Sequence, residues 1–220
     1  GEALVAHPLV GKVTFTGSTE VGRSVGVEAA RRFAGASLEL GGKSANIVFD
    51  DASLEKAVNG VISGIFAAGG QTCMAGSRLL VQSGIADELV DRVARRASSI
   101  VVGDPSDLST EMGPLIGPDQ VDRVHRLIRR ASDAGATVVS GGAPLPDLGP
   151  AFLAPTVIDG VQQHMEIANT ELFAPVLVVE RFETEEEAIE IANATEFGLV
   201  AGVWTESIAR AHRIVARLDV

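Results

Sequence analysis

The chain has 220 residues, which is enough for one large domain or for one and a half small domains. Hydrophobic residues make up 46% of it and charged residues 21%, as is ordinary for a soluble globular protein with a packed core. The net charge of -11 repels nucleic acid and anionic membrane surfaces, which excludes both as main partners.

The predicted elements alternate between strand and helix along the chain. Strands are expected at residues 12–16, 37–40, 45–49, 78–82, 137–140, 155–158, 176–182 and 199–205. Helices are expected at residues 20–33, 85–100, 119–134, 184–193 and 207–218, with one more that begins after Ser53. This alternation predicts an α/β fold, a mostly parallel sheet with helices on both faces and with binding sites at the carboxyl ends of its strands.

The longest uncharged stretch, residues 57–76, is long enough to raise the question of a membrane span. Polar residues and several glycines interrupt it. It therefore predicts a buried helix that runs into a glycine-rich loop, and we expect no membrane partner.

Cys73 lies in a polar, glycine-rich segment, residues 69–78 (GGQTCMAGSR). A lone cysteine is more often a small buried hydrophobe than a nucleophile, and the residue alone leaves that alternative open. The flanking glycines and the Gln-Thr pair favour a loop from which a thiol projects. Because it is the only cysteine, no intrachain disulfide is possible, which fits a reducing compartment; we expect a cytoplasmic protein.

Glu39 lies between two leucines at the end of a predicted strand, within residues 38–44 (LELGGKS). A surface position or a salt bridge with Lys43 would explain it in purely structural terms. A glutamate that is partly shielded from water can instead act as a general base near neutral pH. The Gly41-Gly42 pair would let the backbone approach a ligand closely.

Two further segments have the pattern of cofactor contacts. Residues 15–22 (FTGSTEVG) follow a strand and open a helix, whose free N–H groups and positive dipole end suit a phosphate. They lack the GxGxxG spacing, so a simple helix cap remains the alternative. Residues 171–175 (ELFAP) are either a helix end closed by a proline or a glutamate that holds sugar hydroxyls beside an aromatic ring.

These four segments, in this order, resemble the aldehyde dehydrogenase superfamily. Residues 38–44 resemble its glutamate signature, and residues 70–78 resemble its cysteine signature. Residues 17–19 and 171–175 are similar to its cofactor segments, and the interval from Glu39 to Cys73 is the usual one. The resemblance extends over essentially the whole chain.

The resemblance implies oxidation of a small-molecule aldehyde to a carboxylic acid, with hydride transfer to NAD or NADP. Cys73 would attack the carbonyl as a thiolate, giving a thiohemiacetal and then a thioester. Glu39 would activate the water that hydrolyses the thioester. Because relatives that transfer the acyl group to coenzyme A generally lack this glutamate, its presence favours the acid-forming type.

The resemblance also places residues at the cofactor: Ser18 at the pyrophosphate, Val21 near the adenine, and Leu40 and Gly41 on the nicotinamide side. Glu171 would bind the nicotinamide ribose. The cofactor-binding residues expected in this way are Gly17, Ser18, Val21, Leu40, Gly41, Gln120, Glu171 and Phe173. No metal site is expected, because the histidines are scattered and have no zinc spacing.

Family chains are much longer, so we expect this one to be an internal piece of a homo-oligomeric enzyme. Residues 1–40 would be the end of a Rossmann-like cofactor-binding domain, and residues 41–220 a truncated catalytic domain. With part of the cofactor cleft missing, little or no turnover is expected from the chain alone. An inactive folded piece that serves as an interaction or assembly module is one alternative, and a residual cysteine esterase is another.

A thiol hydrolase or acyltransferase that uses Cys73 is a further alternative. It would need a histidine base. None of the four histidines, His7, His125, His164 and His212, lies in a catalytic motif, which disfavours this class.

Overall fold

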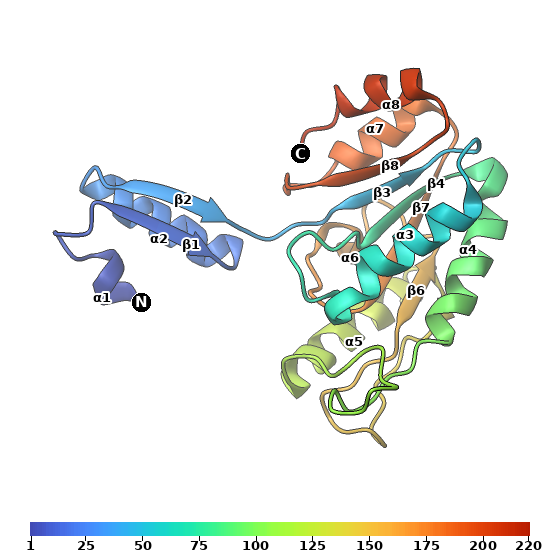
Figure 1. Cartoon of the computed structure of the whole chain (residues 1–220), viewed down its shortest axis with the longest axis horizontal. Coiled ribbons are helices and arrows are strands. Elements are labelled where there is room, and N and C mark those ends of the chain that lie inside the picture. Colours follow the sequence, from blue (N-terminus) through green and yellow to red (C-terminus); the bar gives the residue numbers. More distant parts are fainter. The chain divides into compact units, whose positions relative to one another are not determined.

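The computed structural model describes residues 1–220 (Figure 1). The chain folds into two compact units, Gly1–Gly42 and Lys43–Val220. Each unit has its own strands and helices. No helix in either unit is both long enough and apolar enough to cross a membrane. The stretch around residues 57–76 is a helix followed by a glycine-rich loop, as the sequence predicts.

The first unit is a strand–helix–strand motif preceded by a single helical turn. Its elements are α1 (Glu2–Val5), β1 (Lys12–Thr16), α2 (Thr19–Arg31) and β2 (Gly35–Glu39). β1 and β2 pair in parallel, with Thr16 opposite Glu39, so both strands end at the same edge. Val25 and Ala29 of α2 are buried. The Arg32 side chain donates to the carbonyl oxygens of His7 and Val10 and thereby holds the segment before β1.

The second unit is built on a six-stranded sheet with the order β5-β6-β7-β4-β3-β8. Its strands are β3 (Ala45–Val48), β4 (Arg78–Gln82), β5 (Thr137–Ser140), β6 (Thr156–Asp159), β7 (Val176–Phe182) and β8 (Ala201–Trp204). All neighbouring strands are parallel except β5 and β6, which are antiparallel. The predicted α/β fold with a mostly parallel sheet is therefore confirmed.

Helices cover both faces of this sheet (Figure 1). They are α3 (Leu54–Phe66), α4 (Ser83–Ser98), α5 (Pro118–Asp133), α6 (Glu166–Asn169), α7 (Glu185–Asn193) and α8 (Ile208–Val215). One face packs against α3 and α4, whereas the other packs against α5 and α6 over β6 and β7 and against α7 and α8 over β3 and β4. Alternation along the strands explains this: Leu79 and Val81 face one layer, and Leu80 faces the other.

The predicted strands at residues 12–16, 78–82, 137–140 and 176–182 have the observed bounds, and the other elements differ by one to three residues at their ends. Three short elements are absent from the elements predicted from the residue pattern: α1, α6 and the 3-10 turn η1 (Ala67–Gly70). All three are too short to show a helical period of apolar residues.

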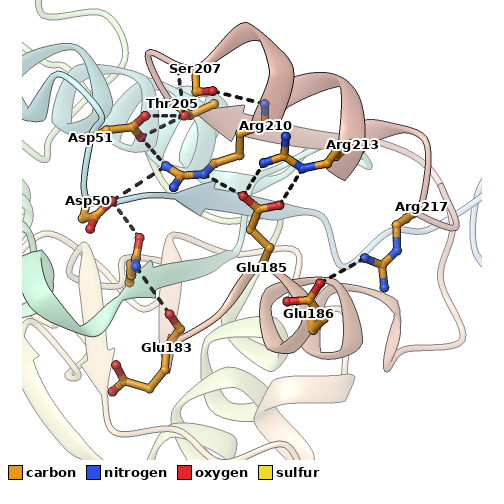
Figure 2. A network of polar contacts seen from close by, with 11 residues as sticks. Asp50, Asp51, Glu183, Glu185, Glu186, Thr205, Ser207, Arg210, Arg213 and Arg217 are labelled. Carbon is orange, nitrogen blue, oxygen red and sulfur yellow. Dashed lines mark hydrogen bonds and ion pairs between the residues drawn. The ribbon is translucent and has the colours of Figure 1, made fainter.

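A network of polar contacts ties α7 and α8 to the ends of the central strands (Figure 2). The Arg210 side chain donates to Glu185 (3.0 Å), forms an ion pair with Asp51 (2.8 Å) and lies 4.7 Å from the centre of the Phe49 ring. Arg213 donates to the same Glu185 carboxylate. The network joins the loop after β3 to the first turn of α7 and to α8.

Candidate functional site

Cys73 lies in the connection between α3 and β4, where η1 ends and the chain turns. The N–H of Ala75 donates to the carbonyl oxygen of Thr72 at 3.2 Å, which closes a turn around Cys73. The thiol belongs to a half-buried side chain, and Cys73 forms no disulfide. This is the projecting loop that the flanking glycines predict.

The backbone before Cys73 has an unusual conformation over three consecutive residues. Ala68, Gly69 and Gly70 all have positive φ, at 51°, 62° and 69°. A Cβ on Gly70 would overlap the carbonyl oxygen of Ala174. Gly70 is therefore needed both for its φ and for close packing, and it brings the Cys73 segment against residues 171–175.

The segment that contains Glu171 and Phe173 is held by two side chains of α5. Gln120 donates from Nε2 to the carbonyl oxygens of Leu172 (2.6 Å) and Phe173 (3.1 Å). Arg123 donates to the Leu172 carbonyl oxygen (2.7 Å) and to Gln120 Oε1 (3.1 Å). Phe173 has a φ of 52°, and its side chain is 41% exposed. Outliers of this kind collect at binding sites, where the surrounding structure enforces them.

The second unit also contains a buried group of charged side chains, Lys43, Arg78 and Glu180. Arg78 donates to the carbonyl oxygens of Lys43 (3.1 Å), Ile191 (2.9 Å) and Ala192 (2.6 Å). Two of these acceptors are in the last turn of α7, where few carbonyl groups have helical partners; the Ile191 carbonyl oxygen also accepts from the N–H of Ala194. The Arg78 side chain therefore caps the carboxyl end of α7 and also binds the backbone of Lys43, the first residue of the second unit.

Lys43 has no hydrogen-bond partner for Nζ, although its side chain is only 2% exposed. Burial, together with the nearby Arg78 charge, lowers the pKa of Lys43 from 10.5 to about 7, against the smaller opposing effects of Glu180 and Glu171. Burial also raises the pKa of Glu180 from 4.5 to about 6. The Arg78 and Glu180 side chains lie 3.6 Å apart, as an ion pair.

In the first unit, the predicted residues meet at the carboxyl ends of β1 and β2. Ser18 caps α2 by accepting from the N–H of Val21 at 3.3 Å. The N–H of Gly17 donates to the carbonyl oxygen of Glu39 at 3.0 Å. The Leu40 side chain packs where a Cβ on Gly22 would be, and the Glu39 side chain is exposed.

A cavity of about 690 Å³ lies between α1, α2 and β1 of the same unit. Phe15, Val21 and Val25 give it apolar walls, and its charged lining residues are Arg23, Arg31, Glu2 and Glu28. Its size is in the range of small-molecule sites, and it adjoins the amino end of α2, where unpaired N–H groups favour phosphate. The residues of this unit therefore fit the adenine and phosphate parts of a dinucleotide.

The structure thus forms two groups of predicted site residues. In the second unit, Cys73, Glu171 and Phe173 are on loops and Gln120 is in the first turn of α5. The first unit contains Gly17, Ser18, Val21, Glu39, Leu40 and Gly41. Sequence reasoning missed Gln71, Arg78 and Arg123, whose side chains hold the loops. For Gln71 and Arg78, the only sequence signal was their position next to or near the glycines of the cysteine segment.

The sequence model of the aldehyde dehydrogenase family matches residues 1–220. The chain belongs to the aldehyde dehydrogenase family. It is 46% identical, over 219 residues, to a betaine aldehyde dehydrogenase of Cereibacter sphaeroides, a match that covers all of this chain and 45% of the relative.

Solved aldehyde dehydrogenase structures have the same fold. The NAD+ complex of the Bacillus cereus enzyme superposes with a TM-score of 0.95 at 41% identity and covers 99% of this chain and 44% of that one. The betaine aldehyde dehydrogenase of Staphylococcus aureus with NAD+ has a TM-score of 0.94 at 39% identity, over 99% of this chain and 44% of that one. The chain therefore spans somewhat less than half the length of these relatives.

Proposed function

We propose that this aldehyde dehydrogenase family protein oxidises an aldehyde to a carboxylic acid with NAD or NADP as hydride acceptor. The observation that carries the proposal is the position of Cys73, its only cysteine, on a turn that follows Gly70, which packs against the Glu171 segment. A buried structural cysteine would not need three left-handed residues and two loops arranged around it. The relatives solved with NAD+ support the choice of cofactor class.

The chemistry assigned to this chain has three steps: addition of the thiol, loss of hydride and hydrolysis. The Cys73 thiolate adds to the carbonyl carbon of the aldehyde and forms a C–S bond, which leaves a thiohemiacetal. A bound nicotinamide cofactor supplies the acceptor for the hydride that leaves this carbon. Glu39 then takes a proton from a water molecule that attacks the resulting Cys73 thioester, which releases the acid and returns the thiol.

Each unit has its own proposed cofactor contacts. In the first unit, Ser18 and the amino end of α2 would take the pyrophosphate, and Val21 the adenine side. In the second, Glu171 would bind the nicotinamide ribose with Phe173 beside it. The Gln120 amide is bonded to the backbone at Leu172 and Phe173, so its proposed contribution is to hold this loop.

The two units would then have different main tasks, with a boundary near residue 40: the first takes the adenine and pyrophosphate parts of the cofactor and supplies Glu39, and the second supplies the nucleophile Cys73 and the contact with the nicotinamide ribose. The substrate is an aldehyde, and the name of the Cereibacter relative makes betaine aldehyde the first to test. We assign the protein to the cytoplasm.

The test is a single-turnover trap on the 220-residue chain, because one equivalent of chemistry is enough to see the intermediate. The Glu39→Gln variant is incubated with NAD or NADP and with betaine aldehyde or hexanal, quenched in acid and mapped by mass spectrometry. We expect an acyl group on Cys73 that equals the aldehyde less two hydrogens, and more of it than in the unmodified chain.

Cys73→Ala is the control and should carry no acyl group. Absence of any adduct on Cys73 with both cofactors and both aldehydes would contradict the proposal for this chain. An adduct that forms without cofactor from an activated ester, but never from an aldehyde, would favour the esterase alternative.

A further inference from the structure

The side-chain amide of Gln71 is bonded at both ends to a loop 43 to 45 residues further along the chain. Its Oε1 accepts from the N–H of Ile116 at 2.9 Å, and its Nε2 donates to the carbonyl oxygen of Pro114 at 3.4 Å. Gln71 is two residues before Cys73. A two-point link therefore fixes the chain immediately before the turn that presents the thiol.

The segment before this link needs outside support. Ala68, Gly69 and Gly70 are all left-handed, and for Ala68 this conformation is unfavourable. The N–H of Gln71 returns to the carbonyl oxygen of Ala68 at 3.1 Å. Strained backbone persists only where the surroundings enforce it, and the Gln71 amide supplies that restraint on the side facing residues 114–116.

The loop that receives the amide is itself anchored. Leu115 is 5% exposed, and its N–H donates to the carbonyl oxygen of Ala151 at 2.9 Å. Met112, three residues earlier, is also buried. The Gln71 amide is thus bonded to a fixed support, so the link can hold the position of the cysteine turn.

Gln120 extends the arrangement to a third loop. It is four residues after Ile116, in the first turns of α5, and its amide holds the Leu172 and Phe173 carbonyl oxygens. Two glutamine side chains therefore connect the cysteine turn, the loop before α5 and the Glu171 segment.

We propose that Gln71 is a positioning residue for Cys73, which holds the thiol in one orientation by fixing the turn to residues 114–116. This inference rests on the proposed function, because it concerns the nucleophile of that reaction. It assigns Gln71 no contact with substrate or cofactor.

Gln82, the last residue of β4, offers a matched control. Gln82 Oε1 accepts from the N–H of Asp50 at 3.0 Å, and its Nε2 donates to the carbonyl oxygen of Glu183 at 3.4 Å. The two glutamines thus make the same pair of backbone bonds, and both side chains are half-buried. Gln82→Met removes the same bonds as Gln71→Met but leaves the cysteine turn alone.

The experiment measures the alkylation rate of Cys73 by iodoacetamide in the 220-residue chain, together with amide hydrogen exchange at Ile116. In Gln71→Met we expect faster exchange at Ile116 and at least about a fivefold rise in alkylation, the equivalent of losing one hydrogen bond. Gln82→Met should change alkylation by less than about twofold. Gln71→Glu keeps the acceptor for Ile116 but loses the donor to Pro114, and it should fall between the wild type and Gln71→Met.

An unchanged or lower alkylation rate in Gln71→Met, with exchange at Ile116 accelerated, would overturn the positioning role. An equal rise in Gln82→Met would show a general loss of stability and overturn it too. If Gln71→Met does not fold, Gln71→Glu decides in the same way. The alkylation experiment needs no aldehyde or cofactor. Its result can therefore contradict the positioning role of Gln71 while the acyl adduct on Cys73 still forms, and the adduct can be absent while the positioning role is supported.

Discussion

The Arg78 guanidinium donates from Nε to the carbonyl oxygen of Lys43 at 3.1 Å, which links the segment after Cys73 to the segment after Glu39. The rest of the guanidinium bonds to the last carbonyl groups of α7. Both of the signature segments that carry the proposed chemistry therefore end on one buried side chain.

Replacing Arg78 by Met should strongly destabilise the second unit. The change removes the side-chain donor to the Ala192 carbonyl oxygen, one of the two donors to the Ile191 carbonyl oxygen, and the ion-pair partner of the buried Glu180 carboxylate. Breaking one side of such a buried pair costs about 3–5 kcal/mol. Urea unfolding followed by the fluorescence of Trp204, the only tryptophan, measures this. Arg92→Met, which removes an exposed pair with Glu88, should cost less than about 1 kcal/mol. Equal losses of unfolding free energy in the two variants would contradict a stabilising role for the buried contacts of Arg78.

Lys43 should make the stability of the second unit depend on pH above neutrality. Its pKa is about 7 when folded and about 10.5 when unfolded, so between these values the unfolded chain binds more protons and stability rises with pH. The penalty of the buried charge is fully present below pH 7 and is relieved towards pH 10.5.

Lys43→Met should therefore gain stability relative to wild type at pH 7.5 and lose about 2.5 kcal/mol of that advantage by pH 9.5, because the slope is close to its maximum of about 1.4 kcal/mol per pH unit. Urea unfolding at both pH values measures the difference. The opposite slope that the raised pKa of Glu180 produces lies between 4.5 and about 6, outside this window. The exposed Lys56→Met is the control, and a pH-independent difference for Lys43→Met would contradict a shifted lysine.

Arg210→Met should weaken the attachment of α8. The variant loses the ion pairs with Glu185 and Asp51 (Figure 2). It also loses the contact with the Phe49 ring. Because the side chain is 23% exposed, we expect a loss of only about 1–2 kcal/mol, smaller in 1 M salt. Thermal unfolding at low and high salt measures it. A loss that salt does not change would assign the effect to packing on Phe49 alone.

Gly70→Ala should disturb the cysteine turn, because Gly70 has φ of 69° and no room for a Cβ beside Ala174. We expect a loss of at least about 2 kcal/mol in unfolding free energy. Gly84→Ala is the matched change. Gly84 is in α4 with nothing within 4 Å of its Cβ position, so alanine there should be neutral or stabilise by about 0.5 kcal/mol. Wild-type stability in Gly70→Ala would contradict the claim that Gly70 must be glycine for its φ and for its close packing against Ala174.

Sequence alone was sufficient for the elements that have a clear period or a clear end. The apolar parts of β4 (residues 79–81) and β7 (residues 176–179) follow a glycine-rich and a proline-ended segment, and the bounds of both strands were predicted correctly. The end of α3 was harder, because the left-handed Ala68 has no sequence signature of the kind that glycine gives. The Cys73 turn was predicted as a loop, but its shape was not.

The supporting side chains of the site could not be predicted because their partners are distant in sequence. Gln71 bonds to residues 43 and 45 positions away, and Arg78 bonds to carbonyl groups 113 and 114 positions away. Backbone carbonyl oxygens are also the same in every residue, so no pattern marks them as acceptors. Only the folded sheet, with β4 between β3 and β7, brings these groups together.

The most direct test of the central claim, that Cys73 is the nucleophile of a nicotinamide-dependent site, is alkylation of Cys73 with and without NAD, read by mass spectrometry. The wild-type chain and Glu39→Gln are compared. We predict rapid labelling whose rate changes when NAD is present, which would mean that the thiol is activated and that the chain still binds the cofactor. Slow labelling that NAD does not affect in either protein would contradict the claim for this chain.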